Sequence, residues 1–404
     1  MQHKQMQRVA GLCLAGSILF GSTAAHASYD ELLKALEENN SITAEQAAAL
    51  KSKAPTYVRP SSKVIKDLAM RGRVHAQFGL VETDNDEGSD DFSTFEIRRA
   101  RIGMRGTLFD NVRAQVEANI VPGSDFSMRA AFLQWREHKP AYIKLGYDKP
   151  RSSIEENTSS SEILTIERSL INGLVAAPGQ STGLALDGKA GILQYGLGVY
   201  TDQANRNTKN EDAEYMLNGM VAVDLGDMVG EGHSLLLRGN LLTSDDAEGS
   251  VGGDYPDDVV TFGGKFGAGA FGLSAEYFMG DNDGNETTGF YVMPSMYLTE
   301  KLQAVVRFEQ AESDEAHGIK APSRYVRDVP SLKVVETLDD AGEVVSKVDP
   351  QAGDEYSSIY VGLNYYFSGH AHKVMLGLEV AELKKTDAGD LDATSVTTAW
   401  RMLF

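Results

Sequence analysis

Residues 95–106 read F-E-I-R-R-A-R-I-G-M-R-G and place four arginines within twelve positions. An arginine guanidinium offers a planar fork of N–H donors that matches the oxygen atoms of phosphate. Rows of arginine and lysine along a pore select anions. This stretch therefore predicts the guidance of anions, if its arginines share one wall. The structural alternative is that they stiffen that wall by pairing with carboxylates, for which Glu117 and the acidic segment 155–167 are available.

Alternation along the same stretch indicates which side chains share a wall, because successive side chains of a β-strand point to opposite faces. We expect Ala100, Ile102 and Met104 to form the apolar face. Arg98 falls on that parity, and we expect it near a rim. The opposite face, together with neighbouring strands, then gathers a basic wall made of Arg71, Arg73, His75, Arg99, Arg101, Arg105, Arg113, Arg129, Arg136 and Lys144.

The same period-2 alternation recurs along most of the chain and predicts β-strands. At the C-terminus, for example, Phe404, Met402 and Trp400 alternate with Leu403 and Arg401. Most of the expected strands have the roughly 9–11 residues that a tilted strand needs to cross a bilayer. We expect sixteen of them, at 68–82, 92–106, 111–121, 128–138, 141–148, 182–188, 191–201, 213–225, 233–243, 258–266, 270–280, 288–298, 302–312, 356–367, 372–383 and 394–404.

The connections between these strands predict the architecture. Outer-membrane barrels have short turns at one end, long connections at the other and an even number of strands, whereas a β-sandwich has no reason to alternate so regularly. The fold class predicted is all-β: a transmembrane antiparallel β-barrel with its apolar face toward lipid and a polar, wet lumen. Tight turns such as 109–110, 139–140, 189–190, 299–300 and 369–370 alternate with the longer connections 83–91, 149–181, 202–212, 244–257, 281–287, 313–355 and 384–393. One connection, 122–127, is an exception, because it is short where a long one is expected.

The N-terminal region indicates export. Residues 1–27 carry a basic start, a short apolar run and an A-x-A site ending at Ala27, which predicts a signal peptide. Residues 28–60 predict a short periplasmic helical leader and linker, and 61–404 the barrel. Cleavage after Ala27 removes Cys13, the only cysteine, so the mature chain cannot form a disulfide. No later segment has eighteen consecutive apolar residues, which argues against helical membrane spans.

Charge is distributed unevenly along the chain. The formal net charge is −20, and removal of the signal peptide makes it −22. Residues 58–155 hold 16 Lys and Arg against 14 Asp and Glu, whereas residues 156–404 hold 17 against 39. A basic wall in the first part therefore lies within an acidic protein, and the overall charge favours the alternative in which the arginines are paired.

The connection 149–181 contains more apolar residues, such as Ile171, than a solvated loop is expected to carry. A loop that folds back into the lumen and narrows it explains this pattern. Such a loop would bring Lys149, Arg151 and Arg168 close to the basic wall, and we include these three residues in the predicted anion path.

Four stretches carry a resemblance to a known family. They are F-E-I-R-R-A-R-I-G-M-R-G at 95–106, L-G-Y-D-K-P-R-S-S-I-E-E-N-T-S-S at 145–160, I-E-R-S-L at 166–170 and V-G-L-N-Y-Y-F at 361–367. In their order and spacing the chain resembles the phosphate-selective porin O and P family of bacterial outer membranes. The resemblance implies a sixteen-stranded homotrimeric porin whose inward loop and basic ladder guide anions. It also implies that Phe404 belongs to the signal read by the barrel-assembly machinery.

The chain departs from the family pattern at two places. Arg151 and Ser152 stand where the family usually has a Pro-Phe-like pair. The later strands supply few basic residues beyond Arg238, Lys265 and Arg307. The basic ladder that the family implies is therefore confined largely to the first strands.

Three functions remain open from the sequence. The first is a passive outer-membrane channel for small inorganic anions, phosphate first, set in lipid and lipopolysaccharide. The second is a general porin, weakly selective or cation-preferring, with its arginines paired. The third is a plugged barrel with a structural or adhesive role. The chain has no G-x-S-x-G, H-E-x-x-H, P-loop or cysteine pair, so we predict no enzyme, cofactor, metal site or nucleic-acid partner.

Overall fold

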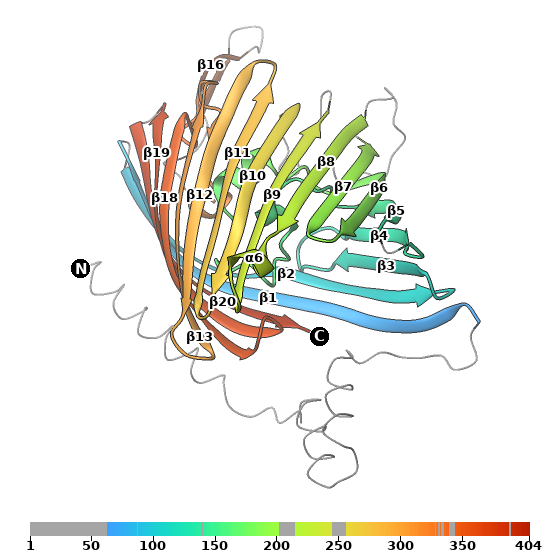
Figure 1. The fold of residues 1–404 in the computed structure, drawn as a ribbon. Helices are drawn as coiled ribbons and strands as arrows, with labels where there is room; N and C mark the ends of the chain where they lie inside the picture. The colour runs from blue at the N-terminus through green and yellow to red at the C-terminus, as the bar shows by residue number, and fades with distance from the viewer. Residues whose placement is uncertain are drawn as a thin grey trace.

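The structure, a computed structural model, describes residues 63–404 except for 87, 139, 202–214, 245–255, 328, 330–331, 333–334, 339–343 and 388. The predicted signal peptide at 1–27 and helical leader at 28–60 lie outside the described residues. Within the described part, sixteen antiparallel strands close into a barrel (Figure 1), which confirms the predicted fold class.

Every predicted strand overlaps one strand of the barrel. Neighbours in sequence pair around the wall, β13 is followed by β18, and β20 returns to pair with β1. The barrel strands are β1 (Ile65–Asn85), β2 (Gly88–Leu108), β3 (Val112–Asn119), β4 (Ser127–Trp135), β5 (Tyr142–Asp148), β6 (Ser181–Ala190), β7 (Leu193–Thr201), β8 (Tyr215–Asp224), β9 (His233–Thr243), β10 (Asp258–Ala268), β11 (Phe271–Asn282), β12 (Asn285–Tyr297), β13 (Leu302–Ser313), β18 (Glu355–Ser368), β19 (His372–Thr386) and β20 (Gly389–Leu403).

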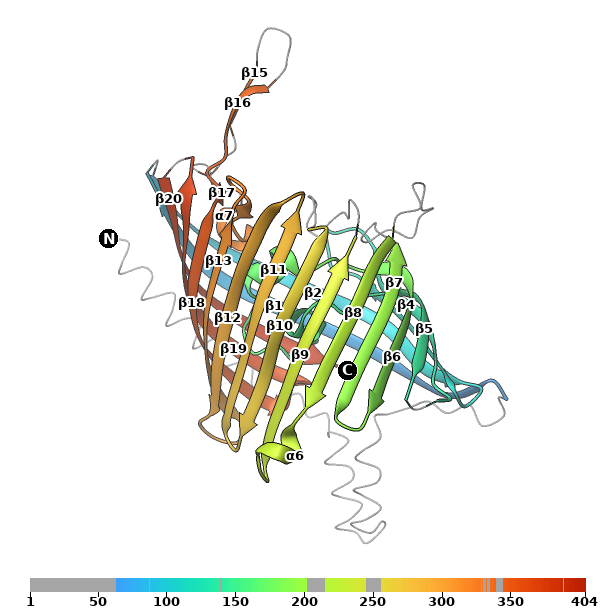
Figure 2. The same ribbon diagram turned by 45° about the horizontal axis from the view of Figure 1, so that its top comes forward.

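The smaller elements belong to the connections. Two small sheets pair β14 (Ile319–Lys320) with β17 (Ala352–Gly353) and β15 (Val335–Leu338) with β16 (Val344–Val348). Figure 2 shows β15 and β16 projecting beyond the rim of the barrel. None of the helices in the described residues combines the length and the hydrophobicity that a membrane-spanning helix needs. These helices are α4 (Ile154–Asn157), α5 (Leu170–Val175), α6 (Gly226–Val229) and α7 (Ser323–Val326).

Apolar residues cover the outside of the wall, as β18 illustrates. Ile359, Val361 and Leu363 are 52%, 49% and 40% exposed, whereas Tyr360 and Asn364 on the other parity are buried. In a bilayer the exposed row faces hydrocarbon, and a closed barrel leaves no unpaired strand edge there. The strands thus have the predicted orientation, with the polar face inward.

Three of the predicted long connections are wrong. The strands that flank 83–91, 281–287 and 384–393 continue further than predicted and meet in tight hairpins, for example between Asn85 and Gly88. Backbone hydrogen bonds extend a hairpin whether its side chains are apolar or acidic, so the acidic residues of these stretches concealed the strand ends. β1 and β2 reach 21 residues each in this way.

Two long connections enter the barrel. Residues 149–181 carry α4 and α5 into the lumen (Figure 1). The connection 313–355, which the sequence predicts to be external, sends Ile319 and Tyr325 into the same buried apolar cluster as Ile171 of the first loop. That prediction is therefore wrong for this part of the connection, because its apolar side chains leave water by packing on the first loop.

The barrel closes between β1 and the C-terminal strand β20. The backbone N–H of Gly72 donates to the carbonyl of Phe404 at 2.7 Å, and the N–H of Phe404 donates to the carbonyl of Gly72 at 3.1 Å. The pairing continues to Asp84 opposite Asp392. The Phe404 ring, which is 71% exposed, occupies the place that a side chain on residue 72 would take, so a larger residue there must displace the ring.

Replacing Gly72 with valine should displace the Phe404 ring and weaken closure, because overpacking costs about 1–3 kcal/mol. We expect less folded barrel in the membrane fraction, measured as the heat-modifiable band on a gel. Gly219→Val on β8 is the matched control, since a side chain there meets open space. Equal yields of the two variants would contradict the role assigned to Gly72.

Candidate functional site

The loop 149–181 is held in the lumen by the N-terminal ends of its two short helices. Ser153 caps α4 and Ser169 caps α5 from within the loop. Two wall carboxylates add to these caps. Glu276 on β11 accepts hydrogen bonds from the first two N–H groups of α4 at 2.6 and 3.1 Å. Glu309 on β13 accepts from the first N–H of α5 at 2.9 Å. Helix-terminal donors lack partners within their own helix, so Glu276 and Glu309 supply acceptors that these two helices have only inside the barrel.

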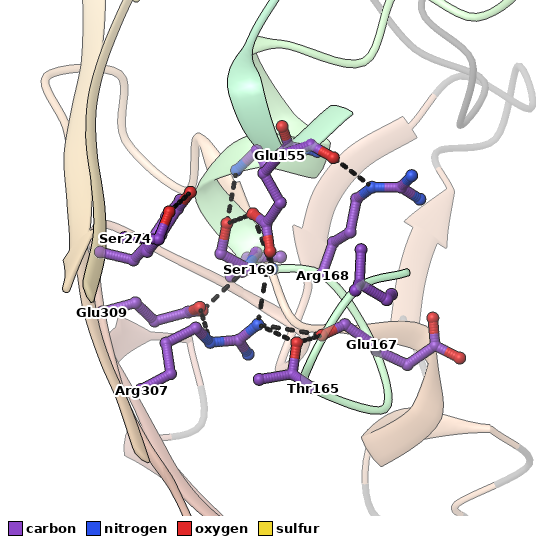
Figure 3. Close-up of polar contacts among 12 residues, drawn as sticks. Glu155, Thr165, Glu167, Arg168, Ser169, Ser274, Arg307 and Glu309 are labelled. Carbon is purple, nitrogen blue, oxygen red and sulfur yellow. Dashed lines mark hydrogen bonds and ion pairs between the residues drawn. The ribbon is translucent and has the colours of Figure 1, made fainter. Parts of the chain in front are cut away.

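Arg307 on β13 is the centre of the ionic contacts that fix the loop (Figure 3). Its fully buried side chain pairs with Glu309 of the wall at 3.0 Å and lies 3.7 Å from Glu155 of the loop. It also pairs with Glu379 of β19 at 3.0 Å and donates to the carbonyl of Glu167 at 2.9 Å. A buried charge persists only when charged and hydrogen-bonding partners replace its water. Arg307 thus ties the loop to two strands of the wall.

Four further cations on the later strands bind the same loop: Arg238 on β9, Lys265 on β10, Lys373 on β19 and Arg401 on β20. Each donates to a side-chain or backbone oxygen between residues 157 and 166. Arg401 alone reaches four backbone carbonyls. The few basic residues that the later strands supply therefore hold the loop.

Cations of the predicted basic wall are paired where that wall faces the loop. Arg73 and Arg101 share Glu117 of β3, at 3.4 and 3.5 Å. Arg99 lies 3.6 Å from Glu167 of the loop. These are the carboxylate partners that the structural alternative required, so at this level much of the positive charge of the wall is compensated.

The expectation that Arg98 lies on the apolar side near a rim is wrong. The pairing of β2 with β1 skips Arg98, which is the extra residue of a β-bulge between His75 and Ala76. A bulge re-aims the side chain that it contains, and Arg98 donates to Glu167 at 2.8 Å. One inserted residue breaks a strict period of two, and the sequence pattern does not reveal where.

Four more members of the predicted set, one on β5 and three in the loop, are also in ion pairs. Together with Arg73, Arg99 and Arg101, this makes seven of the eleven predicted site cations. The pairs of these four are Lys144 with Asp148 at 2.7 Å, Arg151 with Asp187 at 3.3 Å, Lys149 with Glu156, and Arg168 with Glu156 at 3.4 Å.

The loop charges influence one another. Burial would raise the pKa of Glu156, but Arg168 and Lys149 outweigh it and lower that pKa. Burial would also raise the pKa of Glu167, but the nearby Arg98 and Arg99 outweigh burial and lower that pKa. Burial lowers the pKa of Lys149 to about 8, against the opposing effect of Glu156. Lys149 therefore carries its charge at neutral pH and loses it in mildly alkaline solution.

Four predicted site residues have no carboxylate within 4 Å among the described residues: Arg71, Arg105, Arg113 and Arg136. They lie on β1 to β3 and just after β4, at the end of the barrel that has the short turns. Arg105 and Arg113 lie within electrostatic range of each other and of the other two, and Asp67 is the carboxylate that acts on them from further away. We call these four residues the arginine cluster; it carries a net positive charge.

A comparison with known protein families supports the resemblance found in the sequence. Residues 68–237 match the family described as phosphate-selective porin O and P. The match spans 170 of the 404 residues and covers the first part of the barrel. The family resemblance expected from the sequence motifs is therefore confirmed, and the protein is a porin that forms a channel in the bacterial outer membrane. No curated protein matches the chain.

Solved porins share this fold at low sequence identity. The outer membrane channel DcaP of Acinetobacter baumannii is 13% identical, with a TM-score of 0.55, over 87% of this chain and 100% of its own. An anion-selective porin from Comamonas acidovorans is 14% identical, with a TM-score of 0.54, over 83% of this chain and 99% of its own. A loop-deletion mutant of OmpT from Vibrio cholerae is 11% identical, with a TM-score of 0.55, over 83% of this chain and 99% of its own.

The sequence prediction omitted the residues that position the loop of this porin. Arg401, Lys373, Glu276 and Glu309 all fall on the polar parity of predicted strands, which is the one signal that could have found them. Their partners are groups of a loop that lies far away in the sequence, and strand alternation does not reveal the path of that loop. Within the described residues, no three His, Cys, Asp or Glu side chains are grouped so as to hold a metal ion.

Proposed function

We propose that this porin passes small anions by passive diffusion, with phosphate as the preferred one. The observation that carries the proposal is the arginine cluster, because its four guanidinium groups have no close carboxylate in the described structure. Arg71 uses one donor on the side-chain oxygen of Gln115 at 3.1 Å, and the remaining donors of the cluster are available to phosphate oxygens. Their summed charge favours the entry of an anion at this end of the lumen.

Free donors remain where the loop narrows the lumen. Arg99 on β2 and Arg129 on β4 each keep a buried guanidinium nitrogen without a hydrogen-bond partner within the described residues. Both belong to the wall formed by β1 to β4, which also carries the arginine cluster.

The opposite wall supports this placement of the anion path. The five cations of β9, β10, β13, β19 and β20 donate to the loop, so their donors are occupied. Three wall carboxylates, Glu276, Glu309 and Glu379, lie on the same side. Positive charge that is free to act on a solute is therefore concentrated on β1 to β4.

A general, weakly selective porin is the second candidate. It is favoured by the ion pairs of seven of the eleven predicted cations, and by the net charge of −22 after signal removal. A plugged barrel is the third candidate, because both inward connections share one buried apolar cluster. Liposome swelling distinguishes the third candidate from the other two, since a plugged barrel admits no small sugar.

We also propose that three copies assemble with the wall of β3 to β5 at their interface. These strands have 8, 9 and 7 residues, at or below the lower end of the roughly 9–11 that cross a bilayer. A neighbouring copy would cover the wall where it is too short to face lipid alone. A solved OmpT of Vibrio cholerae, 12% identical with a TM-score of 0.52, is described as a trimer form.

Changing Arg105 and Arg113 to Gln together should weaken the anion preference about fivefold, since each unit charge at ~8 Å in water contributes about 0.5 kcal/mol. The measurement is the reversal potential in a planar bilayer under a KCl gradient, with added phosphate as a competitor of the chloride current. Lys189→Gln is the matched control, because it removes one exposed cation from a short turn at the same end of the barrel.

An unchanged reversal potential in the double variant would mean that the arginine cluster does not line the path. If phosphate fails to reduce the chloride current of the unmodified channel, the preference for phosphate is wrong, and a simple anion channel remains.

Anion preference should also fall as the pH rises through about 8, because Lys149 loses its charge there. The pKa of Lys149 is lowered from 10.5, so its cation is present below this pH and absent above it. The loss of one charge should reduce the anion-to-cation permeability ratio roughly twofold. Lys149→Met should remove this pH step, and a step of the same size in that variant would assign the titration to another group.

The proposed assembly predicts three chains in each detergent-solubilised particle, as counted by native mass spectrometry. Leu145→Arg on β5, where the leucine is 60% exposed on the single chain, should shift the particles toward single chains, because an unpaired charge in an apolar interface is costly. Single chains in the unmodified protein would contradict the proposal, and an intact assembly in the variant would move the interface away from β5.

A further inference from the structure

We infer that the tip of the loop, residues 159–166, is an internal clasp across the seam of the barrel, and that Arg401 is the residue that fastens it. The seam is the pairing of the first strand, β1, with the last strand, β20. It is the final edge that must close before the barrel has no free edge. The loop leaves the wall after β5, yet its tip reaches back to this seam.

One side of the clasp is on β1. Arg73 donates to the hydroxyl of Ser160 at 3.1 Å, and Nε2 of His75 lies 3.4 Å from the hydroxyl oxygen of Ser161. Arg73 and His75 are both buried beneath the tip. The tip therefore rests directly on the inner face of the first strand.

The other side is on β20 and its neighbour β19. Arg401 donates to the carbonyl of Ser160 at 2.8 Å, to that of Thr165 at 3.4 Å and to that of Ile166. Lys373 on β19 donates to the carbonyl of Ile163 at 2.8 Å. Ser160 thus receives hydrogen bonds from both sides of the seam, from β1 at its hydroxyl and from β20 at its carbonyl.

Arg401 has few alternatives to the loop. Its side chain is 1% exposed, and no carboxylate lies within 4 Å of it among the described residues. If the tip moved away, the guanidinium would lose its carbonyl acceptors, and a buried charge without acceptors is unfavourable. In the pairing of β1 with β20, Arg401 lies opposite His75, so the register of the closed seam puts both anchors under the tip.

Seam closure and docking of the tip must therefore favour each other. If closure of the seam makes docking of the tip more favourable, docking of the tip makes closure more favourable by the same free energy. The loop that narrows the channel would accordingly stabilise the closed barrel, and the narrow channel would form only once the last strand is in place. This role is independent of which solute the channel selects.

The test compares Arg401→Gln with Arg238→Gln. Arg238 on β9 also donates to the loop, at Asn157, but lies far from the seam along the sheet. The measurement is the temperature at which the folded band of the full-length protein converts to the unfolded band on a gel. We expect a clearly larger fall for Arg401→Gln than for Arg238→Gln. Equal falls, or no fall for Arg401→Gln, would overturn the inference.

A second variant separates the clasp from a direct effect of Arg401 on strand pairing. Replacing residues 159–166 with three glycines removes the carbonyl acceptors and leaves Arg401 in place. This variant alone should lower the conversion temperature, and adding Arg401→Gln to it should produce little further change. If the tip variant converts at the temperature of the unmodified protein, or if Arg401→Gln has its full effect in that background, the tip does not clasp the seam.

Discussion

Charged groups inside this barrel depend on oxygen atoms that are brought to them from elsewhere in the chain. A guanidinium taken from water must recover both hydrogen bonds and charge compensation. The loop 149–181 supplies much of this compensation. Arg307 is surrounded mainly by carboxylates and Arg401 by backbone carbonyls, and both are almost completely buried. The loop is held in the lumen because it satisfies these cations, and they in turn determine its path.

The compensation differs between the two sides of the lumen. Cations on β9 to β20 donate hydrogen bonds to the loop. Wall carboxylates such as Glu276 and Glu309 accept hydrogen bonds from the first N–H groups of its helices. On β1 and β2, Arg73, Arg99 and Arg101 at the level of the loop are paired, whereas the arginine cluster near the short turns has no carboxylate within 4 Å among the described residues. The basic residues of β9 to β20 thus hold the loop in place. On β1 to β4, the arginine cluster keeps positive charge that no nearby carboxylate compensates.

The sequence is informative about this fold where side-chain alternation is the deciding signal. Each of the sixteen predicted strands is present, because lipid outside and water inside impose a period of two on every strand. The strand ends at 83–91 were wrong because backbone pairing continues through acidic residues beyond the bilayer. The predicted position of Arg98 on the apolar face was wrong because a β-bulge inserts one residue, and side-chain alternation does not show where an insertion lies.

The candidate site was harder to predict, because alternation along a strand shows which face a side chain is on but not which residue it contacts. Arg101 and Arg105 are four residues apart on one strand and share its inner face, yet only Arg101 has a carboxylate, that of Glu117, within reach. Whether an arginine is paired or free depends on register with the next strand and on the path of a distant loop. Arg401 illustrates the same limit, since its acceptors lie more than 230 positions earlier in the chain.

The most direct measurement is the reversal potential of the unmodified channel in a planar bilayer under a KCl gradient. An anion-selective value is expected, although the mature chain has a net charge of −22, because we propose that the arginine cluster lines the path. A cation-selective value would contradict this, since it would show that the acidic charge of the protein, and not the arginine cluster, determines which ions pass.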